Sequence, residues 1–405
     1  MTSLVGIILL PLVAWLLSSN RRAINFRTVG FAFALQAGIG GAALFTDWGH
    51  AGLLTVSEYV AVLLDYSRAG TEFMFGDLAN TGGSIGFIFA FSVLPVVIFF
   101  SSLIAVLYHL GVMQWVIRIM GGGLRRLLGT SHTESLSAAA NVFVGQAEAP
   151  LVAKPYIPGM TVSELFAVMV GGMASIAGSV MAGYVALGIP LEYLLAASFM
   201  AAPGGLLMAK LLEPETHVPI EPDSDKAPES EAYVNLVDAA ASGAMNGLNM
   251  AAAIAAMLMA FIALIALFNG VLGWAGGLVG FQDVTLQGLL GFVLQPLAWT
   301  LGVPWEEAQL AGSLIGQKLV LNEFVAYVGY MDVAEQFTPL SKAVVIFALC
   351  GFANLSSIAI LLGGLGAVAP MRRDEISRYG FRALLAATLS NLMSAALAGF
   401  FISLG

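Results

Sequence analysis

Long apolar stretches recur along the whole chain, and they constrain its fold more than any other feature. A helix needs about 20 apolar residues to cross a bilayer, where its own hydrogen bonds satisfy the backbone. Only 10% of the 405 residues are charged and 59% are hydrophobic, so a soluble fold would lack a polar surface. We predict an all-α membrane protein with eight transmembrane helices. The predicted spans are Leu4–Leu17, Val29–Phe45, Ile85–Leu110, Leu165–Leu187, Leu191–Leu211, Met250–Val271, Ala343–Ala369 and Leu384–Leu404.

Other features exclude several classes of protein. The single cysteine, Cys350, allows neither a disulfide within the chain nor a cysteine metal cluster. A net charge of −9 disfavours nucleic acid as a partner. The sequence has no Gly-rich phosphate loop that ends in Lys-Ser/Thr, which disfavours direct drive by ATP.

Basic residues in short loops predict the orientation in the cytoplasmic (inner) membrane. Three clusters, Arg21–Arg27, Arg118–Arg126 and Arg372–Arg378, fall on one side if the N-terminus is outside. Eight spans then leave the C-terminus outside as well. The acidic loop Glu213–Glu231 falls inside and is typical of a solvated linker. The basic amphipathic stretch Trp115–Leu128 predicts an interfacial helix.

Two regions, Thr133–Tyr156 and Trp305–Tyr330, are too polar for lipid-facing spans. Each is long enough for two half-helices folded back as a re-entrant hairpin. Each carries Gly-Gln followed by a glutamate, Glu148 or Glu323, and precedes a span with a polar break. On the predicted topology the hairpins enter from opposite sides, as an inverted repeat. Such repeats with interrupted helices indicate a transporter with its site near the midplane.

The two glutamates are the strongest functional candidates, because an ionisable group at membrane depth is costly unless paired, hydrated or functional. A structural alternative is that each caps a half-helix or pairs with Lys154 or Lys318. Neutral polar groups in the same windows suit a hydrogen-bonding solute such as a sugar or nucleoside, although any single one could be helix–helix glue. These groups are Asn141, Gln146, Gln317, Asn322, Asn354, Ser356 and Ser357.

Unwound backbone offers carbonyl oxygens to Na⁺ in transporters with broken helices. The segments Asn141–Gly145 and Ser175–Gly178 are candidates for such a cation site, with ordinary Gly and Ser packing as the alternative. Phe352 lies close to Asn354 in sequence and is a candidate for stacking on a base or sugar face, or else a core side chain.

Three motifs closely resemble signatures of the concentrative nucleoside transporter family: Gly145–Leu151, Asn322–Tyr327 and Cys350–Ser357. The resemblance extends from about Met113 to Ala369. It implies eight spans, two opposed re-entrant hairpins and interfacial helices. It also implies a homotrimer in membrane lipid, whose transport domains move like elevators against a fixed scaffold.

The resemblance also implies roles for individual residues. Gln146 and Glu148 would contact the nucleobase, and Glu323 would bind ribose hydroxyls. Asn354 and Ser357 would also bind ribose, with Phe352 close by. The co-transported Na⁺ would lie at Asn141, Val144, Ser175 and Ile176. The family usually has Thr where this chain has Ala147, which leaves the choice between purine and pyrimidine bases open.

The expected organisation begins with N-terminal scaffold spans in residues 1–112. Residues 113–211 and 303–370 form the two repeats of the transport domain, and residues 212–233 the acidic loop. Residues 234–302 hold an interfacial helix at about Ala239–Leu248, span six and an external amphipathic segment; residues 371–405 hold span eight.

We expect a sodium-coupled nucleoside symporter and not an enzyme. Proton coupling is the main alternative. A membrane-embedded enzyme and a channel are weaker ones. The enzyme is disfavoured because the histidines show no metal spacing and the two candidate glutamates, Glu148 and Glu323, lie far apart in sequence.

Overall fold

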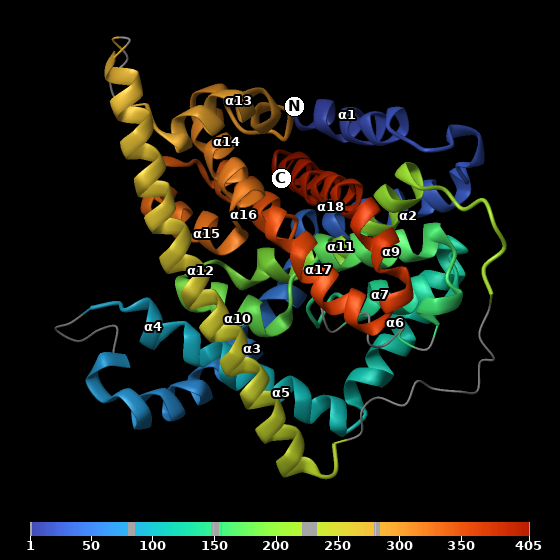
Figure 1. The fold of residues 1–405 in the computed structure, drawn as a ribbon, viewed down its shortest axis with the longest axis horizontal. Coiled ribbons are helices and arrows are strands. Elements are labelled where there is room, and N and C mark those ends of the chain that lie inside the picture. Colours follow the sequence, from blue (N-terminus) through green and yellow to red (C-terminus); the bar gives the residue numbers. More distant parts are fainter. Residues whose placement is uncertain are drawn as a thin grey trace.

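The computed structural model describes residues 2–79, 86–146, 149, 154, 156–220, 233–278, 280 and 284–404. This part of the chain contains helices and no strand, which confirms the predicted all-α membrane class (Figure 1). The helices are α1 (Ser3–Leu16), α2 (Phe26–Phe45), α3 (Asp47–Phe75), α4 (Phe89–Ser92), α5 (Leu94–His109), α6 (Val112–Leu128), α7 (His132–Ala140), α9 (Val162–Ala174), α10 (Gly178–Leu187), α11 (Leu191–Leu212), α12 (Leu236–Leu278), α13 (Leu286–Thr300), α14 (Trp305–Val320), α15 (Glu323–Val333), α16 (Pro339–Leu349), α17 (Leu355–Val368) and α18 (Arg373–Ile402). Single-turn 3₁₀ helices lie at Arg21–Ala23, Gly76–Ala79, Ile157–Gly159, Ala334–Gln336 and Pro370–Arg372.

Within the described residues, 6 helices are long and apolar enough to cross a membrane, or 7 if the bent pair α13–α14 is one span. Three further apolar helices, α1, α16 and α17, are too short to qualify alone. The molecule is therefore an all-helical membrane protein. The number of eight spans stays a prediction.

The two polar breaks expected from the sequence are present. The first separates α9 from α10, and the second separates α16 from α17. Gly351 in the second break has φ +148°, a conformation that side-chain-bearing residues rarely adopt. A Cβ on Gly351 would also collide with the Asn391 side chain and lie 2.7 Å from the carbonyl oxygen of Ala174.

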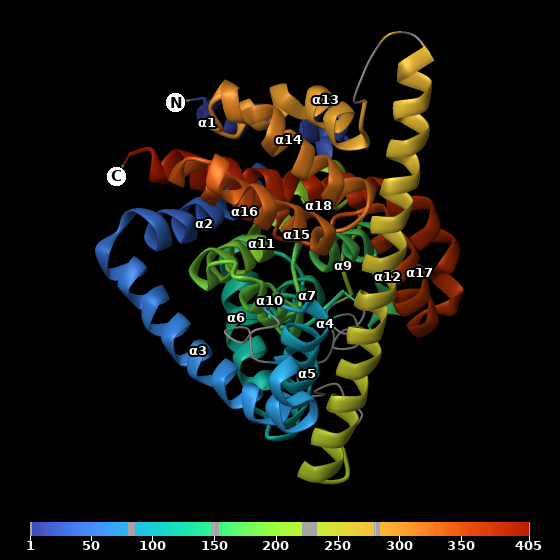
Figure 2. The same cartoon turned by 90° about the vertical axis from the view of Figure 1, so that its left-hand side faces the viewer.

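The structure differs from the sequence interpretation at two helices. The 29-residue helix α3 was not predicted, because its acidic and basic residues interrupt every apolar stretch. The interfacial helix expected at Ala239–Leu248 is instead the start of the 43-residue helix α12. Gly243 and Gly247 let this part lie close against α5, and the Ser102 hydroxyl donates to the Ala240 carbonyl at 2.8 Å. Figure 2 shows α12 running along one side of the molecule.

Hydrogen bonds bring together the segments that carry the three basic clusters. The Thr28 hydroxyl of α2, beside the first cluster, donates at 2.9 Å to the carbonyl oxygen of Leu128 at the end of α6, which carries the second cluster. Arg382 of α18 donates to the carbonyl oxygens of Leu17 and Leu212, at 2.8 and 2.9 Å. Arg372 donates to Ile157 O at 3.0 Å. The end of α1, the end of α11 and the start of α18 therefore meet, on the right-hand side of Figure 1.

A buried ion pair holds α7 against its neighbours at this same end. Lys210 of α11 pairs with Glu134 of α7 and donates to the Ser163 hydroxyl of α9 at 2.8 Å. Both charged side chains are buried, so each needs the other. The pair fixes the base of α7, from which the chain runs toward Gln146.

Candidate functional site

Glu323 is the first residue of α15, and its buried carboxylate lies at the centre of the candidate site. Asn322 caps the helix, because its Oδ1 accepts from the backbone N–H of Val325 at 2.9 Å. The Tyr184 hydroxyl donates to Glu323 Oε1 at 3.0 Å. The Asn354 amide donates to Oε2 at 2.9 Å. Both carboxylate oxygens are thus oriented by neutral donors.

The hydrogen bonds continue from Glu323 through the second break to the first predicted hairpin. Asn354 caps α17, and its Oδ1 accepts from the Ser357 N–H at 3.0 Å. The Ser357 hydroxyl accepts from Gln146 Nε2 at 3.1 Å. An unbroken chain of polar side chains therefore joins Gln146, Ser357, Asn354, Glu323 and Tyr184. Four of these five were predicted as substrate-binding residues.

Tyr184 is the member of this chain that sequence reasoning missed. It lies in α10, with 0% of its side chain exposed, and its ring packs on Phe324 and Tyr327 at centroid distances of 4.6 and 4.7 Å. A polar side chain in the apolar half-helix after a break was the available signal. That sequence signal did not indicate that the Tyr184 hydroxyl would reach Glu323.

Phe352 lies where the two breaks touch. Its backbone N–H donates to Ser175 O at 3.1 Å, so the breaks are hydrogen-bonded to each other. Its ring is near the first predicted hairpin, since a Cβ on Gly145 would lie 4.0 Å from the ring edge. The Gly178 N–H donates to Phe143 O at 2.9 Å and ties that hairpin to the first break.

The four predicted sodium-site residues, Asn141, Val144, Ser175 and Ile176, are all buried. Asn141 ends α7, and neither atom of its amide is hydrogen-bonded to any residue that the structure describes. It lies against the end of α9, because a Cβ on Gly171 would be 3.0 Å from Asn141 Nδ2. A buried amide without a partner is costly, which makes it a candidate ligand for an ion.

One structural alternative for the glutamates is an ion pair with one of two lysines. Lys154 is exposed. Lys318 donates elsewhere, and no ion pair joins it to Glu323 within the described part of the chain. Glu148 and Ala147 lie outside the described residues, so the predicted role of Glu148 stays a prediction.

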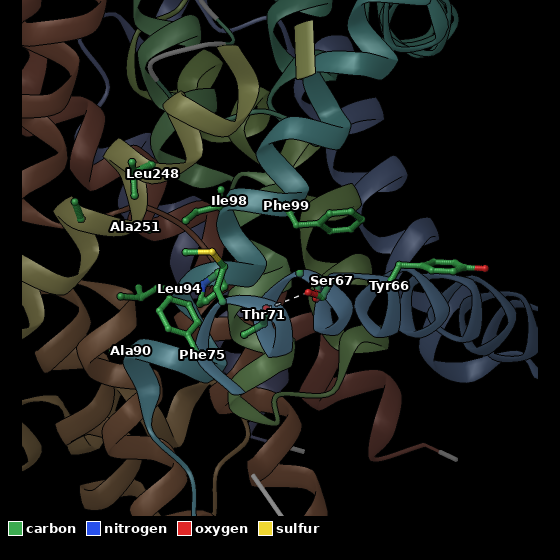
Figure 3. Close-up of a pocket in the computed structure, with 14 residues that line it drawn as sticks. Tyr66, Ser67, Thr71, Phe75, Ala90, Leu94, Ile98, Phe99, Leu248 and Ala251 are labelled. Atoms are coloured by element: carbon green, nitrogen blue, oxygen red, sulfur yellow. Dashed lines mark hydrogen bonds between the residues drawn. The ribbon is translucent and has the colours of Figure 1, made fainter. Parts of the chain in front are cut away.

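A cavity of about 510 Å³ lies elsewhere, between α3, α5 and α12 (Figure 3). Apolar side chains such as Phe75, Leu94, Ile98 and Phe99 surround it. It contains none of the predicted site residues, and its lining is too apolar to bind a solute rich in hydroxyls.

Comparison with known protein families decides which family the chain belongs to. Residues 193–399 match the model for the C-terminus of the Na⁺-dependent nucleoside transporters, and residues 5–78 match the model for their N-terminus. Residues 90–191 match a model described as nucleoside recognition. The chain belongs to the concentrative nucleoside transporter family.

Relatives in this family are similar over nearly the whole chain. The nucleoside permease NupC of Helicobacter pylori is 49% identical over 99% of this chain and 98% of its own length. The putative nucleoside permease NupX of Escherichia coli is 48% identical over 100% of this chain and 99% of its own length. The mouse sodium/nucleoside cotransporter 1 is 38% identical over 98% of this chain and 63% of its own length. These relatives are transporters and permeases, which confirms the expectation that the chain is not an enzyme.

Solved structures of the family member CNTnw share the fold. Its inward-facing substrate-bound structure is 52% identical, with a TM-score of 0.96 over 100% of this chain and 98% of that one. An outward-facing structure of a CNTnw variant has a TM-score of 0.97 at the same identity, over 100% and 99% of the two chains. The concentrative nucleoside transporter fold is thus known in both inward-facing and outward-facing states.

Proposed function

We propose that the protein is a symporter that imports nucleosides across the inner membrane, coupled to Na⁺. The observation that carries this proposal is the hydrogen-bonded chain around Glu323. It unites side chains from the first predicted hairpin, α10, the start of α17 and α15, and no ion pair joins the Glu323 carboxylate to a lysine or arginine among the described residues. Such a group suits a neutral ligand with hydroxyls, because charge-assisted hydrogen bonds are stronger than neutral ones.

The ribose and the base would occupy different parts of this chain. Glu323 would accept hydrogen bonds from the ribose hydroxyls, while Asn354 and Ser357 complete the ribose site. Gln146 would face the nucleobase, together with Glu148. Phe352 would pack beside the ligand, since its ring lies near Gly145.

The Na⁺ ion would bind where α7 and α9 end. Asn141 offers a buried amide oxygen there without a described partner, and the unwound segment at Ser175 and Ile176 offers carbonyl oxygens. Na⁺ is a hard cation that prefers such oxygen ligands. Val144 would complete the site through its backbone.

Transport would follow an elevator mechanism within a homotrimer. The hairpins and the broken spans would move against α5 and α12, which pack closely on each other. The contacts of α2 favour its moving with the transport domain, although it belongs to the expected scaffold 1–112. Gln36 of α2 is fully buried and donates to the Ser394 hydroxyl of α18 at 3.0 Å.

The basic clusters support an orientation with both termini outside. The segments that carry them meet at one end of the molecule, which would be the cytoplasmic end. The acidic loop 212–233 would then lie in the cytoplasm. The first hairpin would enter from this end, because α7 starts here, and the second would enter from the opposite side.

Uptake of labelled uridine and adenosine into proteoliposomes tests the function. An inward Na⁺ gradient at equal pH should drive accumulation above equilibrium, and replacing external Na⁺ by choline should abolish it. Accumulation that follows a pH gradient and ignores Na⁺ would contradict sodium coupling and favour protons. No saturable uptake under either gradient would contradict the symporter itself.

A further inference from the structure

Both broken spans end a half-helix in the interior of the protein. The last carbonyl groups of a helix have no partner within it and carry a partial negative charge. The carbonyl ends of α9 and α16 are both buried, so each needs donors or a cation from elsewhere.

At the second break, Lys318 supplies that cation. Its ammonium group donates to the carbonyl oxygen of Ala348, in the last turn of α16, at 2.8 Å. It also donates to Asn391 Oδ1 of α18 at 2.8 Å. The Lys318 side chain is 2% exposed, so these contacts replace its hydration. The Tyr327 hydroxyl donates to the neighbouring carbonyl of Ile346 at 3.0 Å.

Asn391 links this lysine to the first break. Its Nδ2 donates to the carbonyl oxygen of Ala174 at 2.6 Å, at the end of α9. The side chain of Asn391 is also where a Cβ on Gly351 would collide, so the glycine makes room for the link. One amide thus bridges the carbonyl ends of both broken spans.

The two repeats differ at corresponding places. In the second, the last turn of α14 faces the end of α16 and carries Lys318. In the first, the end of α7 faces the end of α9 and carries Asn141, a neutral residue. No lysine or arginine of the described residues forms a hydrogen bond with the last turn of α9, whose Gly171 carbonyl accepts from the Ser175 hydroxyl.

We propose that Lys318 is a tethered cation that fills, in the second repeat, the ion position that the first repeat leaves for Na⁺. This inference rests on the proposed sodium coupling. The ammonium group stabilises the carbonyl end of α16 throughout the cycle, so only the first break exchanges an ion. Lys318 is accordingly a positioning residue: it holds the break that presents Asn354 to Glu323, without touching the solute.

Two neutral variants of the full chain separate charge from packing. In Lys318→Gln the side chain keeps an oxygen that can help to bind an ion, whereas in Lys318→Met it does not. We would measure the unfolding temperature Tm of each purified protein against Na⁺ concentration, with choline replacing Na⁺ at constant ionic strength. Binding of Na⁺ to the folded protein stabilises it by mass action.

The expected results differ between the variants. In choline, both should lose about 5 °C or more of Tm, because the buried carbonyl groups lose their cation. Na⁺ should restore Tm in Lys318→Gln along a steeper curve, whose Hill slope rises from about 1 toward about 2 as a second ion binds. The Na⁺ curve of Lys318→Met should have the same slope as that of the wild type. Its Tm should stay below the wild-type Tm at every Na⁺ concentration.

Two outcomes would overturn the proposal. One is a Lys318→Gln protein whose Tm deficit relative to the wild type stays the same at every Na⁺ concentration, since its amide should admit an ion. The other is identical behaviour of the two variants, which would make the lysine a packing residue. A wild-type Tm that ignores Na⁺ would instead contradict the proposed sodium coupling itself.

Discussion

Replacing Glu323 by Gln is expected to abolish nucleoside uptake while the protein still folds and assembles. Gln has nearly the same shape, but it loses the charge that strengthens hydrogen bonds from two ribose hydroxyls. Its NH2 group would also place a donor against either Tyr184 or Asn354, both of which donate to the carboxylate. Losing two charge-assisted bonds costs about 3–6 kcal/mol, or roughly 10²–10⁴-fold in affinity.

The matched control is Glu306→Gln, which changes an exposed glutamate in the first turn of α14. Uptake of labelled uridine, measured per folded protein from size-exclusion profiles, should be normal in this control. Full transport by Glu323→Gln would contradict the ribose role. Loss of the folded peak would show instead that the carboxylate stabilises the fold.

Replacing Asn141 by Ala should weaken the binding of Na⁺ more than any other substitution near the first break. The amide oxygen of Asn141 has no partner among the described residues and is the side-chain oxygen that we assign to the ion. Removing one ligand should raise the half-saturating Na⁺ concentration by about tenfold or more, which corresponds to about 1.4 kcal/mol. Uptake at saturating Na⁺ should fall less.

Ser137→Ala is the control for this prediction. Ser137 lies one turn earlier on α7, is fully buried, and its hydroxyl likewise has no hydrogen-bond partner in the described part of the chain. The Na⁺ curve of this variant should match that of the wild type. An equal shift in both variants would show that α7 packing, and not ion ligation, sets the sodium dependence.

Local sequence patterns predicted the elements that carry the site. The polar breaks at Ser175 and Asn354 were visible because Gly, Ser and Asn interrupt apolar runs that are long enough to span a membrane. Asn322 and Asn354 also cap the helices that follow them, a role that the sequence interpretation did not assign to them. Glu323 stood out because an acid at membrane depth is rare.

Contacts between distant segments could not be predicted in this way. The bonds from Tyr184 to Glu323 and from Lys318 to Asn391 join residues 139 and 73 positions apart. Their partners depend on how half-helices cross in three dimensions, which no periodicity encodes. The helix α3 was missed for a different reason: its charges interrupt the apolar pattern, so hydropathy alone gave no span.

The central claim is that the Glu323 carboxylate holds the ribose, and competition for binding tests it most directly. Labelled uridine bound to the purified wild-type protein in Na⁺ would be displaced by unlabelled uridine or by 2′,3′-dideoxyuridine, which lacks both hydroxyls. Our account predicts that the dideoxy compound binds at least about tenfold more weakly, because the buried carboxylate then lacks the two ribose hydroxyls as donors. Equal displacement by the two compounds would contradict it.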